Sequence, residues 1–364
     1  MQATSDPATS PPYVTPAHQN AVGHWLLICL LLIGLLVAVG GYTRLSGSGL
    51  SITEWKPIYG TIPPLDITEW QEEFEKYKTI PQYEHINKGM TLDEFKGIYW
   101  PEFWHRNLGR LIGLVYALPM FFFMARGAFS KTFSMRMFGI LALGGLQGLI
   151  GWIMVASGLQ DRLYVHHLKL AIHFGAAMLL VSAIFWTWLD VKKGEKTHTQ
   201  YQSPPQRKRG FFTAIITLLI FAQLIIGALV AGLHAGLIYN HFPSMDGQHW
   251  VASDVWHFSG SWFDHIPMVQ FIHRWLAKLI VILSLIWWLT YRHQLTHQHG
   301  TKTATRLFFL LLTVQFTLGV LTLVYVVPIG YALTHQLGGV ALLLASLHLH
   351  HCLSKGDNTP IQIK

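Results

Sequence analysis

Two histidines in apolar segments of the chain are each preceded, three residues earlier, by a polar side chain of similar shape. Glu102-x-x-His105 recurs 168 residues later as Gln270-x-x-His273. The carboxyl group of the first motif is replaced by an uncharged amide in the second. An ionisable group inside a membrane segment is costly unless it has a function. The difference therefore favours a duplicated chain with one reactive half and one supporting half.

Four histidines occupy related positions in the predicted duplication. His105 and His273 are equivalents, and so are His173 and His335, which are 162 residues apart. Each lies near the outer end of a different predicted membrane span, so we expect all four at one depth. Two facing imidazoles in each half are suited to hold a haem iron through two axial bonds. A hydrogen-bonded structural histidine is the alternative, and zinc alone would require a closer cluster of ligands.

The composition is that of a membrane protein. Of the 364 residues, 51% are hydrophobic and 12% are charged, and the mean hydropathy is +0.36. Eight apolar runs are long enough to cross about 30 Å of hydrocarbon. They are expected at 24–43, 103–124, 137–156, 167–189, 211–233, 269–290, 307–327 and 333–353.

Lysine and arginine mark the cytoplasmic side of such proteins. They gather in the connections after the second, fourth and sixth predicted spans and are absent between Phe211 and Ile272. We therefore expect both termini in the cytoplasm. The net charge of +8 derives mainly from these connections and does not indicate nucleic-acid binding. The segment before Gly23 resembles neither a signal peptide nor a mitochondrial transit sequence, which favours a bacterial inner membrane as the location.

These features predict an all-α integral membrane protein whose eight transmembrane helices form two four-helix bundles, related as parallel repeats. Gln147-x-x-x-Gly151 and Gln315-x-x-x-Gly319 carry the same repeat. The expected parts are a cytoplasmic tail 1–23, an N-terminal bundle 24–190 with outer loop 44–101, a cytoplasmic linker 191–210, a C-terminal bundle 211–353 with outer loop 234–267, and a cytoplasmic tail 354–364.

The two outer loops are either lids or simple caps of the bundles, and the sequence leaves both readings open. In the first loop, an acidic amphipathic stretch from Glu69 to Lys78 predicts a surface helix. Within the third span, Gly144, Gly145 and Gly148 permit close contact between helices in the membrane.

Positive side chains cluster near the depth of the four histidines. In lipid such charges need a partner, and haem propionates or loop carboxylates are suitable ones. Snorkelling of the long side chains to the membrane surface is the alternative. The candidates are Arg106, Arg110, Lys169, Arg274 and Lys278.

Glu102 and His105 share one face of a helix because they are three residues apart. If His105 ligates a haem, the carboxyl group lies near the macrocycle, where it is suited to proton transfer. An acid that simply favours the dipole at the start of a helix is the alternative.

Longer motifs show a resemblance to one family. Gly41-Tyr-Thr-Arg-Leu-Ser-Gly-Ser-Gly-Leu-Ser51, Glu54-Trp-Lys-Pro57 and Glu102-Phe-Trp-His-Arg-Asn-Leu-Gly-Arg110 closely resemble the haem A synthase family. Tyr239 to Gly247, Gln270 to Arg274 and Thr334-His-Gln336 do so as well. The likeness runs from about Gly23 to His351. The absence of a cysteine pair from the first outer loop is similar to the proteobacterial and mitochondrial branch.

This resemblance implies an eight-helix enzyme that oxidises the C8 methyl group of haem O to a formyl group by successive hydroxylations. The product, haem A, serves cytochrome oxidase. By the resemblance, His105 and His173 hold the substrate haem, and Glu102 assists at the methyl group. His273 and His335 hold a haem b that passes electrons. Lys169 stands where arginine is expected, which keeps the charge but loses a bidentate contact to a propionate.

The partners implied are the lipid bilayer, haem O synthase, an electron-transfer partner and the cytochrome oxidase assembly machinery, and a homo-oligomer is left open. Two other classes of protein compete with this reading. A non-enzymatic dihaem b-type electron carrier would have the same four ligands but gives no reason for an acid at Glu102 alone. A transporter built from repeats would be expected to have broken helices at the membrane midplane, whereas the polar residues here lie near the outer face.

Overall fold

The computed structural model describes residues 12–160, 162–194, 204–257, 260–295 and 299–355. Eight helices are long and apolar enough to cross a membrane, which confirms the eight predicted spans. They are α1 (Gln19–Leu45), α4 (Leu92–Ala125), α5 (Lys131–Ala156), α6 (His167–Lys193), α7 (Pro204–Gly232), α8 (Ile266–Tyr291), α9 (His299–Val324) and α10 (Ile329–Lys355). Parts of the predicted tails and of the linker lie outside the described residues.

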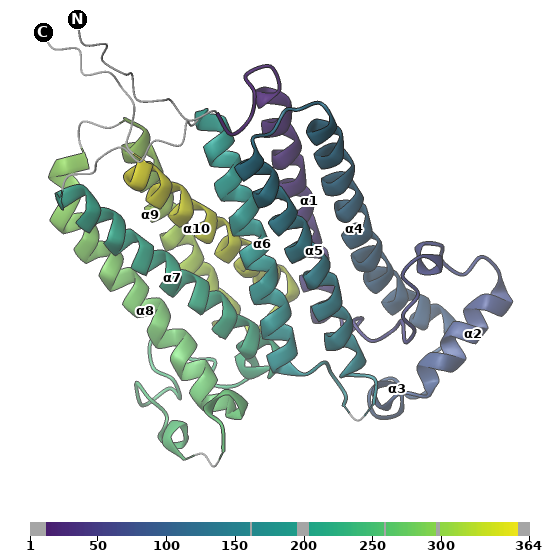
Figure 1. Ribbon diagram of the computed structural model, residues 1–364. Coiled ribbons are helices and arrows are strands. Elements are labelled where there is room, and N and C mark those ends of the chain that lie inside the picture. The colour runs from purple at the N-terminus through teal and green to yellow at the C-terminus, as the bar shows by residue number, and fades with distance from the viewer. Residues whose placement is uncertain (1–11, 161, 195–203, 258–259, 296–298, 356–364) are drawn as a thin grey trace, which may run out of the picture.

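The long helices pack side by side (Figure 1). Helices α1, α4, α5 and α6 form a ring of neighbours, while α7 contacts α8 and α10, and α10 contacts α9. The two groups meet where α1 and α6 pack against α7 and α10. Figure 1 shows both long loops, one after α1 and one after α7, at the same end of the helices. This shared end is the one that the sequence analysis expects to face outward.

Helix α4 begins well before the predicted span 103–124 because its first turn is capped. The Thr91 hydroxyl accepts from the Glu94 main-chain N–H, and the Glu94 carboxylate accepts from the Thr91 N–H at 2.7 Å. This capping box starts the helix at Leu92. The helix then continues through Pro101. Glu102 therefore lies about three turns inside α4, too far from the helix start to act mainly on the helix dipole.

The first outer loop is a folded layer built on this extension of α4. Helix α2 (Ile67–Lys78) confirms the predicted surface helix, and its start is capped by Asp66, which accepts from the Glu69 N–H. Phe74 of α2 stacks on Phe95 of α4, with ring centroids 5.0 Å apart. A short helix, α3 (Pro81–His85), follows. The loop thus has its own aromatic core against α4.

The second outer loop is irregular, with three single-turn helices and a smaller core. The turns are η2 (Ala235–Leu237), η3 (Ser253–Trp256) and η4 (Trp262–Asp264). Met245, Ala252 and Val255 pack on Met268 near the start of α8. Within the loop, burial and the hydrogen bond to the Asp254 carboxylate raise the pKa of Tyr239 to about 12. Both outer loops are therefore fixed to the helix that carries the following histidine.

A buried carboxylate joins the two groups of helices at their opposite end. Asp190 of α6 is only 1% exposed and accepts from Arg136 of α5 at 2.6 Å. Its second oxygen lies 3.0 Å from Nε2 of His351 of α10, which is also buried. The carboxylate therefore links both halves of the chain in a low-dielectric setting, where an unpaired charge is costly.

Removing this carboxylate should destabilise the protein. Asp190→Ala leaves Arg136 without its buried counter-charge, which we expect to cost about 3 kcal/mol. Thermal unfolding of the protein in detergent measures the effect. Asp93→Ala is the matched control, since its ion pair with Lys96 is on the surface and its side chain is 92% exposed. Equal stabilities of the two variants would contradict this assignment.

Candidate functional site

Each of the four candidate histidines lies against a glycine of a neighbouring helix. The pairs are His105 with Gly40, His173 with Gly151, His273 with Gly227, and His335 with Gly319. A Cβ added at these glycines would lie 2.8, 2.8, 3.1 and 2.8 Å from the respective imidazole ring. Any larger residue would therefore displace the ring. The same helix-to-helix contact occurs four times, twice in each half.

Three of the histidines are also held by a glutamine four residues before the glycine. Gln147 donates to the main-chain oxygen of His173 at 3.0 Å and lies 3.2 Å from Nδ1 of its ring. Gln315 holds His335 in the same way, at 2.9 and 3.1 Å. Each amide thus fixes both the backbone and the ring, as groups that support metal-binding imidazoles commonly do.

The third glutamine was not found by sequence reasoning. Gln223 of α7 donates to the main-chain oxygen of His273 at 2.9 Å and lies 3.1 Å from its Nδ1. The signal was present as Gln223-x-x-x-Gly227, the same spacing as in the third and seventh spans. The corresponding position before Gly40 is Leu36, so α1 offers His105 no equivalent amide.

The two histidines of the C-terminal half face each other. The ring centroids of His273 and His335 are 6.4 Å apart, and the ring planes are nearly perpendicular at 84°. Two imidazoles that bind one metal atom from opposite sides, through metal–nitrogen bonds of about 2 Å, need a centroid separation of roughly this size. The geometry therefore fits a single six-coordinate metal, such as a haem iron, between the rings.

The N-terminal half brings His105 and His173 together as well. The two rings lie against Gly40 of α1 and Gly151 of α5, as the rings of the C-terminal half lie against Gly227 and Gly319. Among the described residues, no group of three or more His, Cys, Asp and Glu side chains is arranged to hold a metal ion. A pair of histidines with four open equatorial positions suits a haem better than a bare metal ion.

Glu102 is buried at a junction between α4 and the first outer loop. Only 3% of it is exposed. One carboxylate oxygen accepts from the Ser51 hydroxyl at 2.9 Å and from the Ile52 N–H at 3.0 Å. The other accepts from Nε and Nη2 of Arg106, at 3.0 and 2.5 Å. Arg106 in turn donates to the main-chain oxygens of Ile52 and Glu54. Glu102 and Arg106 therefore fasten the loop to the helix that carries His105.

Gln270 and Arg274 make the corresponding junction in the other half. Here Gln270 donates hydrogen bonds to the loop, whereas Glu102 accepts hydrogen bonds from its loop. The Gln270 amide donates to the main-chain oxygens of Ala235 and Ile238, at 2.9 and 2.6 Å. Arg274 donates to loop carbonyl oxygens, including that of Ser244 at 3.1 Å. The first loop thus presents donors to a carboxylate, and the second presents acceptors to an amide. This complementarity is a physical reason for the difference between Glu102 and Gln270.

The remaining positive side chains have varied surroundings. Arg110 donates to the main-chain oxygens of Lys56, Pro57 and Gly60, at 2.9 to 3.1 Å. The Lys278 ammonium group lies over the Trp275 ring, 4.2 Å from its centroid. Lys169 is partly buried. The three arginines Arg106, Arg110 and Arg274 thus share one role, which is to hold carbonyl oxygens of the outer loops.

One hydrogen bond connects the two histidine sites across the halves. Gln336, which follows His335, donates to the main-chain oxygen of Val37 in α1 at 3.0 Å. Its amide fits against Gly41, where a Cβ would lie 2.7 Å from the amide oxygen. Gly41 directly follows Gly40, the residue on which His105 rests. The sequence analysis quoted Gln336 within a motif but assigned it no contact, because its partner is almost 300 residues away.

The close contact between a histidine ring and a glycine can be tested at Gly151. In Gly151→Ala, the new methyl group would overlap the His173 ring, and we expect a loss of about 1–3 kcal/mol in stability together with weaker haem retention. Gly139→Ala in the same helix is the control, since its Cβ would meet nothing within 4 Å. Denaturant unfolding and haem content of the purified proteins measure both effects. If the two variants behave alike, the glycine contact is not what seats the ring.

Comparison with known proteins is consistent with this geometry. The profile of the COX15-CtaA family, described as cytochrome oxidase assembly protein, matches residues 23–347. The heme A synthase of Nitrosomonas eutropha is 46% identical over 334 residues, which cover 91% of this chain and 93% of that protein. The heme A synthase of Agrobacterium fabrum is 45% identical over 335 residues, covering 90% and 88% respectively. The chain therefore belongs to the COX15-CtaA family of cytochrome oxidase assembly proteins.

Proposed function

We propose that this chain is a haem A synthase, which oxidises the C8 methyl group of haem O to a formyl group and so yields haem A. The contact of each histidine with a glycine, with one pair of histidines in each half, supports two haem sites. The likeness to known synthases is the observation that carries the proposal. Relatives named heme A synthase are 40–46% identical to nearly the whole chain. The product is used in the assembly of cytochrome oxidase.

In this proposal the two halves hold different haems. His105 and His173 hold haem O as substrate, and His273 and His335 hold a resident haem b. When bound, the haem b supplies one-electron redox chemistry. The 6.4 Å separation of the His273 and His335 rings supports a ligand pair in the C-terminal half. Gln223 and Gln315 support it further, since each fixes the orientation of one imidazole.

We assign Glu102 to the substrate half, where it assists the oxidation of the methyl group. It lies one helical turn from His105 and is held by Arg106, Ser51 and Ile52. These contacts support a positioning role, in which Glu102 keeps the outer loop closed over the substrate haem. Proton transfer by the carboxylate is the second possible role. The two roles predict different effects of conservative substitutions at this junction on the rate of haem A formation.

The cationic side chains have two tasks in the proposal. Arg106, Arg110 and Arg274 close the outer loops by holding their carbonyl oxygens. Lys169 and Lys278, which are four and five residues from His173 and His273 in the sequence, are the candidates for ion pairs with haem propionates. The guanidinium groups of Arg106, Arg110 and Arg274 have further N–H donors. We therefore assign these arginines to the propionate side of each pocket as well.

The cellular setting is part of the same proposal. The protein resides in a bacterial inner membrane with both termini in the cytoplasm. Haem O synthase delivers the substrate, an electron-transfer partner exchanges electrons with the haem b, and the oxidase assembly machinery receives the product. The oligomeric state is not part of the proposal.

A dihaem b-type electron carrier is the second candidate, because the same histidine–glycine seating occurs in both halves. Haem extraction from cells that express this chain together with haem O synthase separates the two functions. The synthase should produce haem A in these cells, and a control strain without the chain should contain only haem O and haem b. Bound haem b without any haem A would favour the carrier, and an absence of bound haem would favour a transporter.

Variants of the Glu102 junction should distinguish positioning from proton transfer. If Glu102 positions the loop, Ser51→Ala should lower the rate of haem A formation by about tenfold, because it removes one hydrogen bond of about 1–1.5 kcal/mol. Glu102→Gln should lower the rate further, because it also breaks the buried ion pair with Arg106. Neither should change the shape of the pH–rate profile. If Glu102 transfers protons, Glu102→Gln alone should abolish the activity and remove one limb of that profile.

A further inference from the structure

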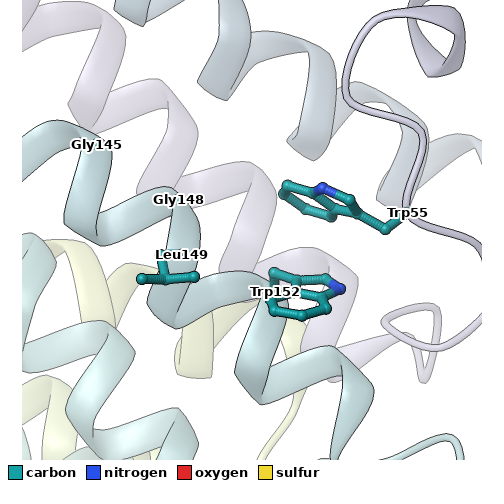
Figure 2. Close-up of a pocket in the computed structure, with 5 residues that line it drawn as sticks. All are labelled: Trp55, Gly145, Gly148, Leu149 and Trp152. Carbon is teal, nitrogen blue, oxygen red and sulfur yellow. The ribbon is translucent and has the colours of Figure 1, made fainter.

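A groove lies on the outer side of α5, in the half assigned to the substrate. It is lined by Gly145, Gly148, Leu149 and Trp152 of α5 and by Trp55 of the first outer loop, and its volume is about 390 Å³. Figure 2 shows the Trp55 indole, reaching in from the loop, above the Trp152 indole beside the two glycines. The ring centroids are 6.0 Å apart. All lining groups are apolar or glycine.

The groove residues are neighbours in sequence of the residues that hold His173. Gln147 and Gly151, which hold and seat His173, lie on the same turns of α5 as the groove residues. By the rise of an α-helix, the groove extends about 10 Å along α5 from Gly145 to Trp152. Trp55 follows directly after Glu54, whose main-chain oxygen accepts from Arg106. The Glu102 junction therefore also fixes the wall of the groove.

The internal repeat provides a comparison within the chain. With Gln147 matched to Gln315 and Gly151 to Gly319, the groove glycines correspond to bulkier residues in α9. Gly145 corresponds to Thr313 and Gly148 to Phe316, whereas Trp152 corresponds to the smaller Val320. The second half therefore has side chains where the first has open space. At the two glycine positions, the halves therefore differ in the space that they leave beside the helix.

We propose that this groove binds the isoprenoid chain of haem O. The inference rests on the proposed function, in which haem O occupies the N-terminal half and haem b the C-terminal half. Haem O carries a long isoprenoid substituent, and haem b lacks it. The asymmetry of the groove thus matches the asymmetry of the two haems. An all-apolar lining suits a hydrocarbon chain, whose burial is favourable in proportion to its area.

The exposure of the groove indicates how the chain enters. Trp55, Leu149 and Trp152 are 51%, 49% and 41% exposed, so the groove opens sideways toward lipid. A flexible chain dissolved in the bilayer can slide between the indoles and α5 without passing through the bundle. The porphyrin then follows toward His105 and His173.

A second copy of the protein fits the groove less well. Helices that associate through small residues bring their backbones into close contact, and a helix is about 10 Å wide with its side chains. Trp55 stands over Trp152 at 6.0 Å and blocks that approach to Gly148. A hydrocarbon chain needs much less room beside the indole than a helix does.

The groove can be filled without disturbing the core. A Cβ at Gly148 meets nothing within 4 Å, and the same holds for Gly139 of the same helix, which lies outside the groove. We therefore compare Gly148→Leu with Gly139→Leu as the matched control. Both full-length variants are purified from cells that make haem O, and the bound haems are extracted and quantified. Circular dichroism and retained haem b verify that each variant is folded.

The expected result is that Gly148→Leu lowers the ratio of haem O plus haem A to haem b by at least about tenfold, which corresponds to losing the burial of only about two methylene groups. Gly139→Leu should leave the ratio unchanged. An unchanged ratio in Gly148→Leu would overturn the proposal. The readout is the bound haem and not the activity.

A second measurement separates this inference from the proposed function. A photoreactive farnesol analogue is crosslinked to the wild-type protein in lipid vesicles, and the labelled peptides are mapped. Labelling of the peptides with Trp55 and Trp152, reduced by haem O but not by haem b, supports the groove even if no haem A is formed. Labelling elsewhere overturns it, and so does a Gly148→Leu protein that only loses self-association while its labelling persists.

Discussion

The contact between a histidine ring and a glycine on the neighbouring helix is the constraint on which the rest of the structure depends. The four glycines leave no room for a Cβ beside the rings, so each pair of helices must approach closely at one level. Gln147, Gln223 and Gln315 then fix three of the rings. This arrangement brings His273 and His335 to a ring separation of 6.4 Å and places His105 and His173 against glycines in the same way, and the two proposed haem pockets are built on these contacts.

The outer loops are adapted to these pairs through the residues that flank His105 and His273. Glu102 accepts hydrogen bonds from its loop, and Gln270 donates hydrogen bonds to its own loop. The carboxylate of Glu102 therefore faces hydrogen-bond donors, and the amide of Gln270 faces hydrogen-bond acceptors. A division of labour between the halves is not required to explain that difference. A basis for such a division lies in the groove of α5, since α9 carries Thr313 and Phe316 at the positions matched to Gly145 and Gly148.

Much of the architecture could be predicted from the sequence because it depends on local patterns. Apolar runs gave the eight spans, and the amphipathic stretch gave α2. The outer extension of α4 was missed because Pro101 was taken as the end of a loop, although Thr91 and Glu94 form a capping box. The partners of Glu102 and Gln336 could not be predicted, since Ser51 and Val37 are distant in sequence and approach only through tertiary packing.

The central claim is that each half holds one haem between its two histidines. The most direct measurement is a cryo-electron microscopy map of the full chain, purified in lipid nanodiscs from cells that make haem O. The account predicts planar density between His105 and His173, with a tail along α5 toward Gly145, and a second planar density without a tail between His273 and His335. Haem density away from these pairs, or a tail in the C-terminal half, would contradict it.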